Sequence, residues 1–373
     1  MHCAQKLWRS GQSWQSTSPS VGEDADLVLY FGAPGTLDDG ARYDELKKAH
    51  PKAHLVGCSS GGEILGVDVH DGSVVATAVT FAGTPVQVAS VRLDDGPGAS
   101  GRAGKALGAE LARDGLRGLF VLSDGLRVNG SELVGGLRAA VGEGVVITGG
   151  LAGDGAAFKR TLVGGDARPA EGCVTAVGFY GPRVRFSAGS AGGWHTFGPE
   201  RRITRADGNV LYELDNKPAL ALYKKYLGDE AANLPGSALL FPLRIQRDAT
   251  GNPLVRTILS VNEADQSMTF AGDVPQGSRA WFMRGTHENL VQGAEVAAGL
   301  ARQSEAALSV LVSCIGRKLL MGQRVGDEVE AAVEALGTAP TIGFYSYGEI
   351  SPDAGGFTDL HNQTMTITTI SED

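Results

Sequence analysis

The chain has 373 residues and a mass of 38.7 kDa, and 42% of its residues are apolar, so it is long enough for two domains with substantial cores. A net charge of −9 without a long run of Lys or Arg argues against nucleic acid as a partner, because phosphate binding requires concentrated positive charge. There is no stretch of about 18 uninterrupted apolar residues, and the N-terminal segment lacks the apolar block of a secretory signal. We therefore expect a cytoplasmic protein without membrane insertion, in which residues 1–26 form a polar, disordered leader.

The cysteines and histidines do not form a recognisable metal site. The four cysteines lie far apart without CxxC spacing, which argues against a zinc site or a disulfide framework. The seven histidines include no HxH or HExxH pattern, which argues against a site made of several histidines. A single histidine is enough to bind haem iron, so the spacing of the histidines says nothing about haem binding.

Three segments of the chain follow the same pattern of strand, helix and strand. Each begins with a short apolar run that is typical of a buried strand, and these runs are residues 27–33, 118–125 and 308–316. Each continues with apolar side chains at helical spacing, as at Leu133, Leu137 and Val141 in the second segment. Each then returns to an apolar run that ends in glycine: "HLVGCSSGGEI", "VVITGGLAGDG" and "PTIGFYSYGEI". The change of period from two to 3.6 and back predicts a parallel βαβ unit that occurs three times.

Further strands should make these sheets mixed. Residues 74–93 and 173–190 are similar to each other and are each typical of a β-hairpin, whereas the third unit supplies one alternating strand, "HNQTMTITTI". The predicted fold is therefore α/β, with two domains built from repeated strand-helix-strand units and mixed parallel and antiparallel sheets. We expect residues 27–225 to hold two of the repeats and residues 235–373 to hold the third. The Pro, Gly and charged residues near residue 230 favour a linker there.

Acidic residues follow the repeated glycines. In each unit a glycine lies near the end of the second strand and a carboxylate comes a few residues later; the pairs are Gly57 and Glu63, Gly149 and Asp154, and Gly343 and Glu349. Ligands of open α/β sheets bind beyond the carboxyl ends of the parallel strands, where such loops converge. The carboxylates could therefore line a cleft and receive an ammonium, guanidinium or hydroxyl group. In the alternative interpretation, they only cap backbone N–H groups in turns.

An arginine in the third unit fits the same cleft. Arg317 follows a strand and a glycine, so its guanidinium could clamp a carboxylate, or could instead pair with Asp327 or Glu328. Consecutive parallel strands of a βαβ unit present their carboxyl ends on one edge of the sheet. We therefore expect Glu349 and Arg317 to face one polar cleft and to bind opposite ends of a small ligand.

The sequence HNQT lies soon after the third glycine loop, at the start of the last strand. It contributes His361, Asn362 and Thr364, and the last two share a face at spacing two. His195 lies in the glycine-rich and aromatic stretch "GGWHTFG", where a surface or core position is favoured over a role as a ligand.

A catalytic interpretation of the first glycine loop is also open. "GCSSG" matches the G-x-S-x-G pattern of a nucleophile elbow, with Ser59 as the nucleophile, but that motif requires a helix directly after the serine. The residues that follow are rich in glycine and β-branched side chains, which do not favour a helix there. Cys58 could act instead as a thiolate with a distant histidine, although a small buried cysteine is more common.

Seven stretches of the chain resemble the FIST family, whose N-terminal and C-terminal halves are tandem sensory domains. They occur in the family's order across residues 27–370 and read "VGCSSGGEI", "GGLAGDG", "VTAVGFYG", "DGNVLYELDNKPALALYKKYLG", "SCIGRKLLMG", "GFYSYGEISP" and "LHNQTMTI". The resemblance implies an intracellular small-molecule sensor, for which amino acids have been proposed as ligands. A subset of stand-alone members binds haem, senses nitric oxide and regulates a histidine kinase. That subset would make His195 or His361 the ligand of haem iron.

These observations favour a sensor over an enzyme. We expect it to bind an amino-acid-like metabolite, or haem and nitric oxide, between its two domains, and to signal through a separate partner such as a histidine kinase. A hydrolase that uses Ser59 or Cys58 is the alternative. The expected ligand-binding residues are Cys58, Ser59, Ser60, Glu63, Gly150, Asp154, Arg317, Tyr345, Tyr347, Glu349, His361, Asn362 and Thr364.

Overall fold

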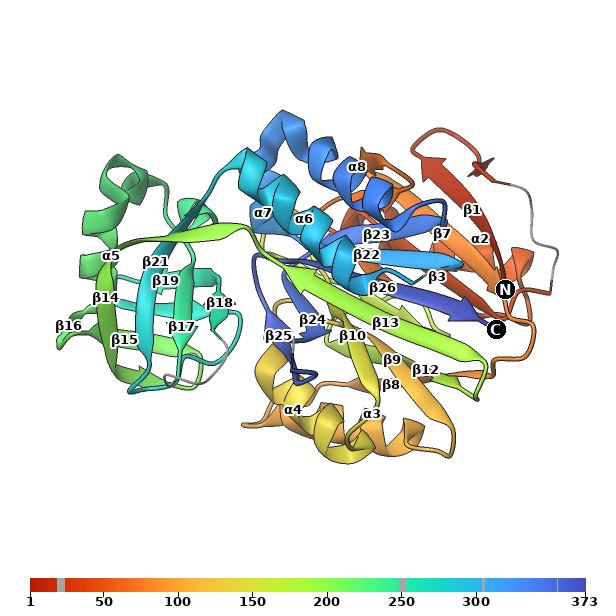
Figure 1. The fold of residues 1–373 in the computed structure, drawn as a ribbon, viewed down its shortest axis with the longest axis horizontal. Helices are drawn as coiled ribbons and strands as arrows, with labels where there is room; N and C mark the ends of the chain where they lie inside the picture. Colours follow the sequence, from red (N-terminus) through yellow and green to blue (C-terminus); the bar gives the residue numbers. More distant parts are fainter. Residues whose placement is uncertain (19–23, 248–252, 304–305, 354) are drawn as a thin grey trace.

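The structure is a computed structural model that describes residues 1–18, 24–247, 253–303, 306–353 and 355–373. Two domains are visible in Figure 1. The small domain, residues 194–285, is inserted between the strand β13 (Val184–Ala191) and the helix α6 (His287–Ala301) of the large domain, which comprises residues 1–193 and 286–373. The mixed α/β fold with two domains is as predicted. The division of the chain differs from the expected residues 27–225 and 235–373, because all three repeated units lie in the large domain.

Three six-stranded sheets form the large domain, and each is built on one of the three repeated units. In each unit a helix connects two parallel strands, and an antiparallel strand lies beside the first of them. The first unit contains β3 (Leu27–Gly32), α2 (Ala41–Ala49), β4 (His54–Ser59) and β7 (Ser73–Thr80). The second contains β9 (Leu116–Ser123), α4 (Gly130–Val141), β10 (Val146–Leu151) and β12 (Cys173–Tyr180). The third contains β22 (Leu308–Cys314), α8 (Val325–Leu336), β23 (Thr341–Ser346) and β26 (Met365–Glu372).

A further antiparallel strand extends each unit on the far side of its antiparallel strand. The strand β8 (Val86–Arg92) fills this position in the second unit, and β13 fills it in the third. In these two units an additional helix packs against the helix of the βαβ crossover: α3 (Ala99–Leu111) packs on α4, and α6 packs on α8. Their apolar spacing buries one face, for example Ala103, Leu107 and Leu111 of α3.

The N-terminal segment fills the same position in the first unit. Residues His2–Arg9 form the strand β1, which pairs antiparallel with β7 along its whole length. Ala4 and Leu7 are buried against the sheet. The structure therefore differs from the expected disordered leader over residues 1–26 in the part that it describes, because residues 2–9 pair with the otherwise free edge of β7; residues 19–23 of this leader lie outside the described residues.

Each sheet is completed by a short strand that belongs to another unit. The strand β5 (Glu63–Leu65) of the first unit pairs with β23, β24 (Gly348–Pro352) of the third pairs with β10, and β11 (Val163–Gly165) of the second pairs with β4. The exchange is cyclic, because every unit gives one strand and receives one. Apolar side chains from all three sheets meet in one core, which includes Phe31, Phe120 and Phe344.

The small domain has its own sheet and core. Its strands include β14 (Trp194–Asp207), β15 (Val210–Leu214), β17 (Leu243–Gln246), β18 (Leu254–Arg256), β19 (Ile258–Asn262), β20 (Ser267–Phe270) and β21 (Arg279–Gly285). The helix α5 (Ala219–Leu227) packs on them through Leu220 and Tyr223. Residues 225–235 therefore lie inside the small domain, in α5 and the following 3-10 turn, and do not form the linker expected near residue 230.

The repeated glycines allow the two parallel strands of each unit to approach closely. Gly57, Gly149 and Gly343 lie opposite Tyr30, Val121 and Leu311 in the register of the parallel pairs. A Cβ atom at these glycines would lie 2.3, 1.9 and 2.1 Å from the respective carbonyl oxygens. No side chain other than hydrogen fits, so the repeated glycine is a packing requirement of the sheet.

We predict that Gly343→Ala lowers the free energy of unfolding by about 3 kcal/mol, because the obstructing atoms belong to the backbone and cannot rotate away. Gly135→Ala is the matched control, since Gly135 lies inside α4 and its added Cβ meets nothing within 4 Å. The control should stabilise the protein by roughly 1 kcal/mol through helix propensity. Urea unfolding of both variants measures the difference, and equal effects would contradict this account.

Candidate functional site

Two of the predicted acidic residues occupy equivalent positions in the exchanged strands. Glu63 lies opposite Phe344 in the pairing of β5 with β23, and its side chain is fully buried. Its carboxylate accepts hydrogen bonds from the hydroxyl of Ser60, and from the backbone N–H and hydroxyl of Ser73 at 3.0 and 2.6 Å. The carboxylate therefore fixes the turn from β5 back to β7.

Glu349 repeats this arrangement in the third unit. It lies opposite Gly150 in the pairing of β24 with β10, and it is also fully buried. Its carboxylate accepts a hydrogen bond of 2.5 Å from Ser346, and two from the N–H and hydroxyl of Thr364 at 3.1 and 2.9 Å. Burial raises the pKa of both Glu63 and Glu349 to about 7, although the hydrogen bonds act in the opposite direction.

The second unit uses other residues at these places. Val163 of β11 takes the position of the two glutamates, and Asp124 instead accepts the N–H of Gly172 at the start of β12, at 2.8 Å. Asp154 lies in the loop after β10, where it accepts the N–H groups of Phe158, Lys159 and Arg160 at 2.7–2.8 Å. The three predicted carboxylates therefore act as caps of backbone groups and do not line one shared cleft.

The remaining predicted residues of the glycine loops are also held by structural contacts. Tyr347 donates its hydroxyl hydrogen to Asp154 and stacks on Phe158, with the ring centroids 4.5 Å apart. Ser59 is buried, and its Oγ accepts the N–H of Leu162 at 2.9 Å. Burial raises the pKa of the Cys58 thiol well above its ordinary value. Neither Ser59 nor Cys58 has the exposure and activation that a nucleophile needs.

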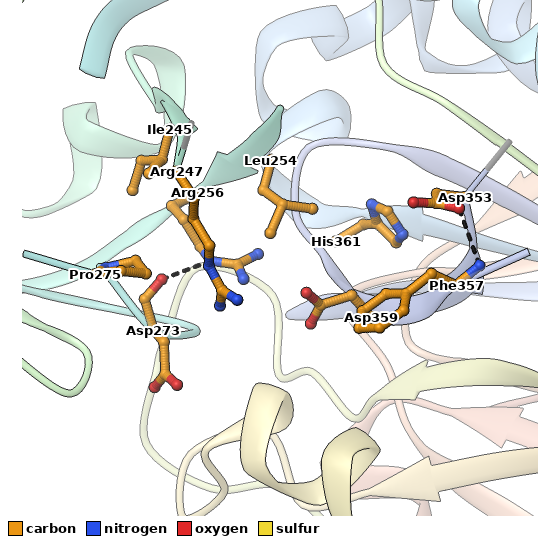
Figure 2. A pocket seen from close by; sticks show the side chains of 10 residues that line it. All are labelled: Ile245, Arg247, Leu254, Arg256, Asp273, Pro275, Asp353, Phe357, Asp359 and His361. Carbon is orange, nitrogen blue, oxygen red and sulfur yellow. Dashed lines mark hydrogen bonds between the residues drawn. The ribbon is translucent and has the colours of Figure 1, made fainter. Parts of the chain in front are cut away.

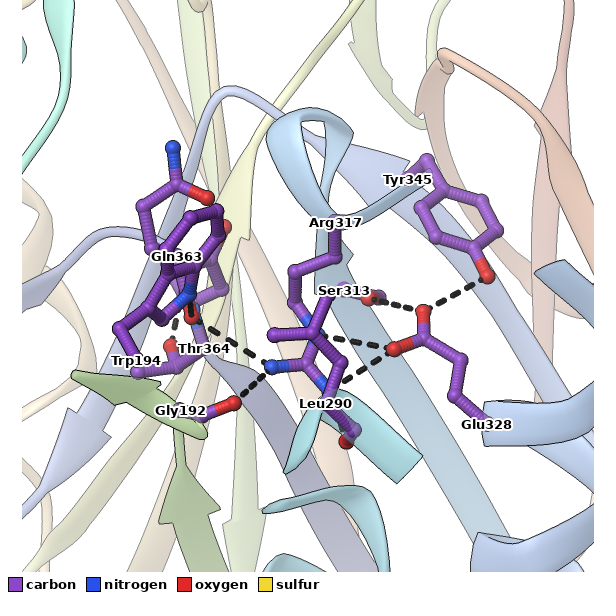
Figure 3. A network of polar contacts seen from close by, with 10 residues as sticks. Gly192, Trp194, Leu290, Ser313, Arg317, Glu328, Tyr345, Gln363 and Thr364 are labelled. Atoms are coloured by element: carbon purple, nitrogen blue, oxygen red, sulfur yellow. Dashed lines mark hydrogen bonds and ion pairs between the residues drawn. The ribbon is translucent and has the colours of Figure 1, made fainter. Parts of the chain in front are cut away.

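Arg317 is buried in a network with the side chain of Glu328, shown in Figure 3. Its Nε and Nη2 lie 2.9 and 2.8 Å from the same carboxylate oxygen. Glu328 in turn accepts hydrogen bonds from Ser313 at 3.0 Å and from Tyr345 at 2.9 Å. Arg317 therefore pairs with Glu328, as in the alternative interpretation of the sequence. The expected cleft shared by Arg317 and Glu349 does not form.

The HNQT sequence joins the two domains. The Oδ1 of Asn362 accepts the N–H of Thr257 in the small domain at 3.3 Å, and the side chain of Gln363 donates to the carbonyl of Leu239 at 2.8 Å. These side chains follow β25 (Thr358–His361), which forms a hairpin with β24. His361 is the member of this sequence that reaches a cavity.

This cavity, of about 220 Å³, lies between the small domain and the β24–β25 hairpin (Figure 2). Six lining residues come from the small domain and four from the hairpin of the large domain. They are Ile245, Arg247, Leu254, Arg256, Asp273 and Pro275, with Asp353, Phe357, Asp359 and His361. Of these ten, only His361 was predicted from the sequence.

Arg256 is the most unusual group in the cavity wall, because its guanidinium is buried without a carboxylate partner. Its nitrogens donate to the carbonyl of Asp273 at 3.1 Å, to the carbonyl of Leu360 at 2.7 Å and to the hydroxyl of Ser131 at 3.2 Å. Among the residues that the structure describes, no acidic side chain lies within ion-pairing distance of it. Burial lowers its pKa, yet a guanidinium stays charged in proteins. A buried cation without a counter-ion favours the binding of an anion.

The opposite wall is acidic. Asp359 accepts only the adjacent N–H of Leu360, at 2.7 Å, and has no basic partner within ion-pairing distance in the described part of the chain. Asp353 accepts N–H groups of the hairpin turn at 2.8 and 3.0 Å. Figure 2 shows Arg247 and Arg256 entering from the small domain and Asp359 and His361 from the hairpin. Positive and negative groups therefore line the same volume of small-molecule size.

The surroundings of the two candidate haem ligands do not fit a haem. His195 is exposed on β14 and contacts the side chain of Asn289. The Nε2 of His361 lies 3.0 Å from the carbonyl oxygen of Ser351, and the cavity beside it is small and lined by charged groups. Within the described residues, no group of three or more His, Cys, Asp or Glu side chains is arranged to hold a metal ion.

The fold and the cavity define a two-domain α/β protein with a charged, ligand-sized space at the domain junction. Family comparisons agree with this class: the FIST N domain matches residues 26–217, and the FIST C domain matches residues 219–352. The chain therefore belongs to the FIST family, as the sequence motifs predicted. FIST domains are sensory, ligand-binding domains. The junction of the two matches lies inside the small domain.

One similar protein is the uncharacterized protein MJ1623 of Methanocaldococcus jannaschii. The two sequences are 24% identical over 352 residues, which is 82% of this chain and 66%, slightly under two thirds, of the length of the relative. None of the helices in the described ranges is both long and apolar enough to cross a membrane.

The raised pKa of Glu349 predicts a specific dependence of stability on pH. The folded protein holds this proton up to about pH 7, whereas the unfolded chain releases it near pH 4.5, so stability is lost as the pH rises between these values. Relative to wild type, Glu349→Gln should gain up to roughly 3 kcal/mol over this range, since it cannot ionise. Urea unfolding at several pH values measures this, with the exposed Glu110→Gln as a control that should show a flat difference. A flat difference for Glu349→Gln as well would contradict the prediction.

Proposed function

We propose that this protein is a sensor that binds a small, amino-acid-like zwitterion in the cavity between its domains. The observation that carries the proposal is the buried Arg256, which has no counter-ion among the described residues and lies in the cavity wall beside the acidic hairpin. A carboxylate would supply the missing negative charge. An ammonium group would then lie toward Asp359.

The size and charge of the cavity support this class of ligand. Its volume of about 220 Å³ is below the range of roughly 300–1,000 Å³ that holds drug-sized molecules, which favours a small metabolite. Arg256 has five N–H donors and uses three of them in bonds to protein atoms, so two remain for a ligand. Leu254 and Phe357 offer apolar surface to the carbon atoms of such a molecule.

The output of the sensor belongs to the same proposal. The family resemblance implies a separate signalling protein, such as a histidine kinase, as the partner. Occupation of a cavity made by two domains changes how firmly these domains are held together, and this is a change that a partner can recognise.

Haem and nitric oxide remain a prediction from the resemblance and are tested separately. Reconstitution of the purified protein with haem should give only the spectrum of free haem if the cavity accepts small zwitterions alone. A shifted Soret band that is lost in His361→Ala would instead favour the haem-binding alternative. The hydrolase alternative lacks an exposed nucleophile, because Ser59 and Cys58 are both buried.

The ligand proposal is tested with the twenty proteinogenic L-amino acids in a thermal shift screen, followed by calorimetric titration of those that stabilise the protein. Asp359→Asn and Arg256→Lys should each weaken binding about ten- to a hundredfold, the worth of one hydrogen bond to a charged group. Analogues that lack the amino or the carboxyl group should bind more weakly in the same way.

Arg244→Lys is the matched control for this titration. Arg244 belongs to the same sheet but lies over the ring of Trp281, at 5.1 Å, outside the residues that line the cavity. Its substitution should leave affinity unchanged. The proposal fails if no amino acid stabilises the protein, or if Asp359→Asn and Arg256→Lys bind as tightly as wild type.

A further inference from the structure

Arg317 binds one of the two chain segments that connect the small domain to the large one, and it also binds the helix that directly follows the other segment. These connections are residues 192–193, which lead from β13 into β14, and residues 285–286, which lead from β21 into α6. The Nη1 of Arg317 donates to the carbonyl of Gly192 in the first connection. Its Nη2 donates to the carbonyl of Leu290, in the first turn of α6 directly after the second, at 2.7 Å. One side chain thus fixes the entrance and the exit of the inserted domain.

The same guanidinium also contacts another point at which the domains meet. Its Nη1 lies 3.5 Å from the carbonyl oxygen of Gln363, which also accepts the indole N–H of Trp194 at 2.8 Å. The side chain of Gln363 donates to Leu239 of the small domain. Figure 3 shows Gly192, Leu290 and Gln363 around Arg317.

The first connection is packed closely against α6. Gly193 has a φ of +98°, and a Cβ atom added to it would lie 2.1 Å from the carbonyl oxygen of Asn289 in α6. A Cβ atom added to Gly293 would lie 2.5 Å from the carbonyl oxygen of Gly192. The first connection therefore lies directly on the backbone of α6, in the place where Arg317 binds both.

Glu328 holds the guanidinium in this position from the large domain. It is fully buried, and it is itself fixed by Ser313 of β22 and Tyr345 of β23, which lie at the carboxyl ends of the two parallel strands of the third unit. The contacts therefore run from the sheet of the large domain through Glu328 and Arg317 to the two connections. A buried ion pair of this kind contributes little to stability compared with apolar packing, but it can specify one arrangement of the parts that it joins.

We infer that Arg317 is a positioning residue that sets the orientation of the small domain, and with it the shape of the cavity, without lining the cavity. Arg256 lies in the cavity wall from the small domain, from which it donates to Leu360 and Ser131 of the large domain, and Asp359 lies in the wall from the hairpin. A rotation about the two connections changes the separation of these walls. The role of the cavity as a ligand site rests on the proposed function, but the orientation of the domains does not.

The orientation is tested by the distance between spin labels on the two domains, measured by double electron–electron resonance. Ala106→Cys on α3 and Ser260→Cys on β19 carry the labels, since both residues are exposed, and Cys3 and Cys173 are replaced by serine because they are partly exposed. We expect one narrow distance distribution for the labelled protein. Arg317→Lys keeps the charge beside Glu328 but loses the planar fork, so it should broaden the distribution or shift it.

Two further variants complete this test. Glu328→Gln should broaden the same distance distribution, and it replaces Arg317→Lys in the test if that variant does not fold. Arg185→Lys is the matched control, because Arg185 forms an exposed ion pair with Asp373 far from the connections and should leave the distribution narrow. Unchanged distributions in both Arg317→Lys and Glu328→Gln would overturn the inference.

Hydrogen exchange separates positioning from a general loss of stability. In Arg317→Lys, the amides of residues 192–197 and 286–292 should exchange at least tenfold faster, whereas those of β3 and β9 should keep their wild-type rates. A uniform increase over all sheets would mean that the pair only stabilises the large domain, and it would reject the inference. Neither measurement uses a ligand, so a failed amino-acid screen leaves its outcome unaffected.

Discussion

The exchange of strands between the three units is the constraint on which the rest of the structure depends. A unit alone would leave the outer edge of its second parallel strand unpaired, and this edge is covered by β11, β5 or β24 from another unit. The three sheets are therefore held together by backbone hydrogen bonds as well as by their shared core. The glycine loops had to be close to one another for this reason, because each loop carries its chain from its own sheet into the next.

This constraint also explains why the acidic residues of the loops are turn caps. A chain that crosses between sheets and returns has backbone N–H groups that no strand pairs, and a buried carboxylate satisfies them. Glu63 and Glu349 do so with nearly identical partners. Burial costs these groups part of their acidity, which is the physical origin of their raised pKa values. The motif is therefore repeated because the same cap is needed at each of these turns.

The sequence allowed the units to be predicted because their signals are local. Apolar periodicity defined the strands and helices, and the recurring glycine, which lies against a neighbouring carbonyl, marked equivalent positions such as Gly57 and Gly343. Glu328 was available as a partner of Arg317 because the two lie within one βαβ unit. The cavity could not be found in this way. Arg256 and Asp359 lie more than 100 positions apart in domains with different folds, and neither belongs to a repeated motif.

The place of the small domain has a consequence for how such a protein can change. In the second unit, a short loop leads from β8 to α3, and in the third unit the whole small domain takes the place of that loop between β13 and α6. The insertion leaves the hydrogen-bonded sheets of the host intact. Mutations in the insert can therefore alter the proposed ligand site at the junction while the sheets of the large domain keep their pairing. The insert and the three-sheet body are separable modules, open to independent selection and to replacement by design.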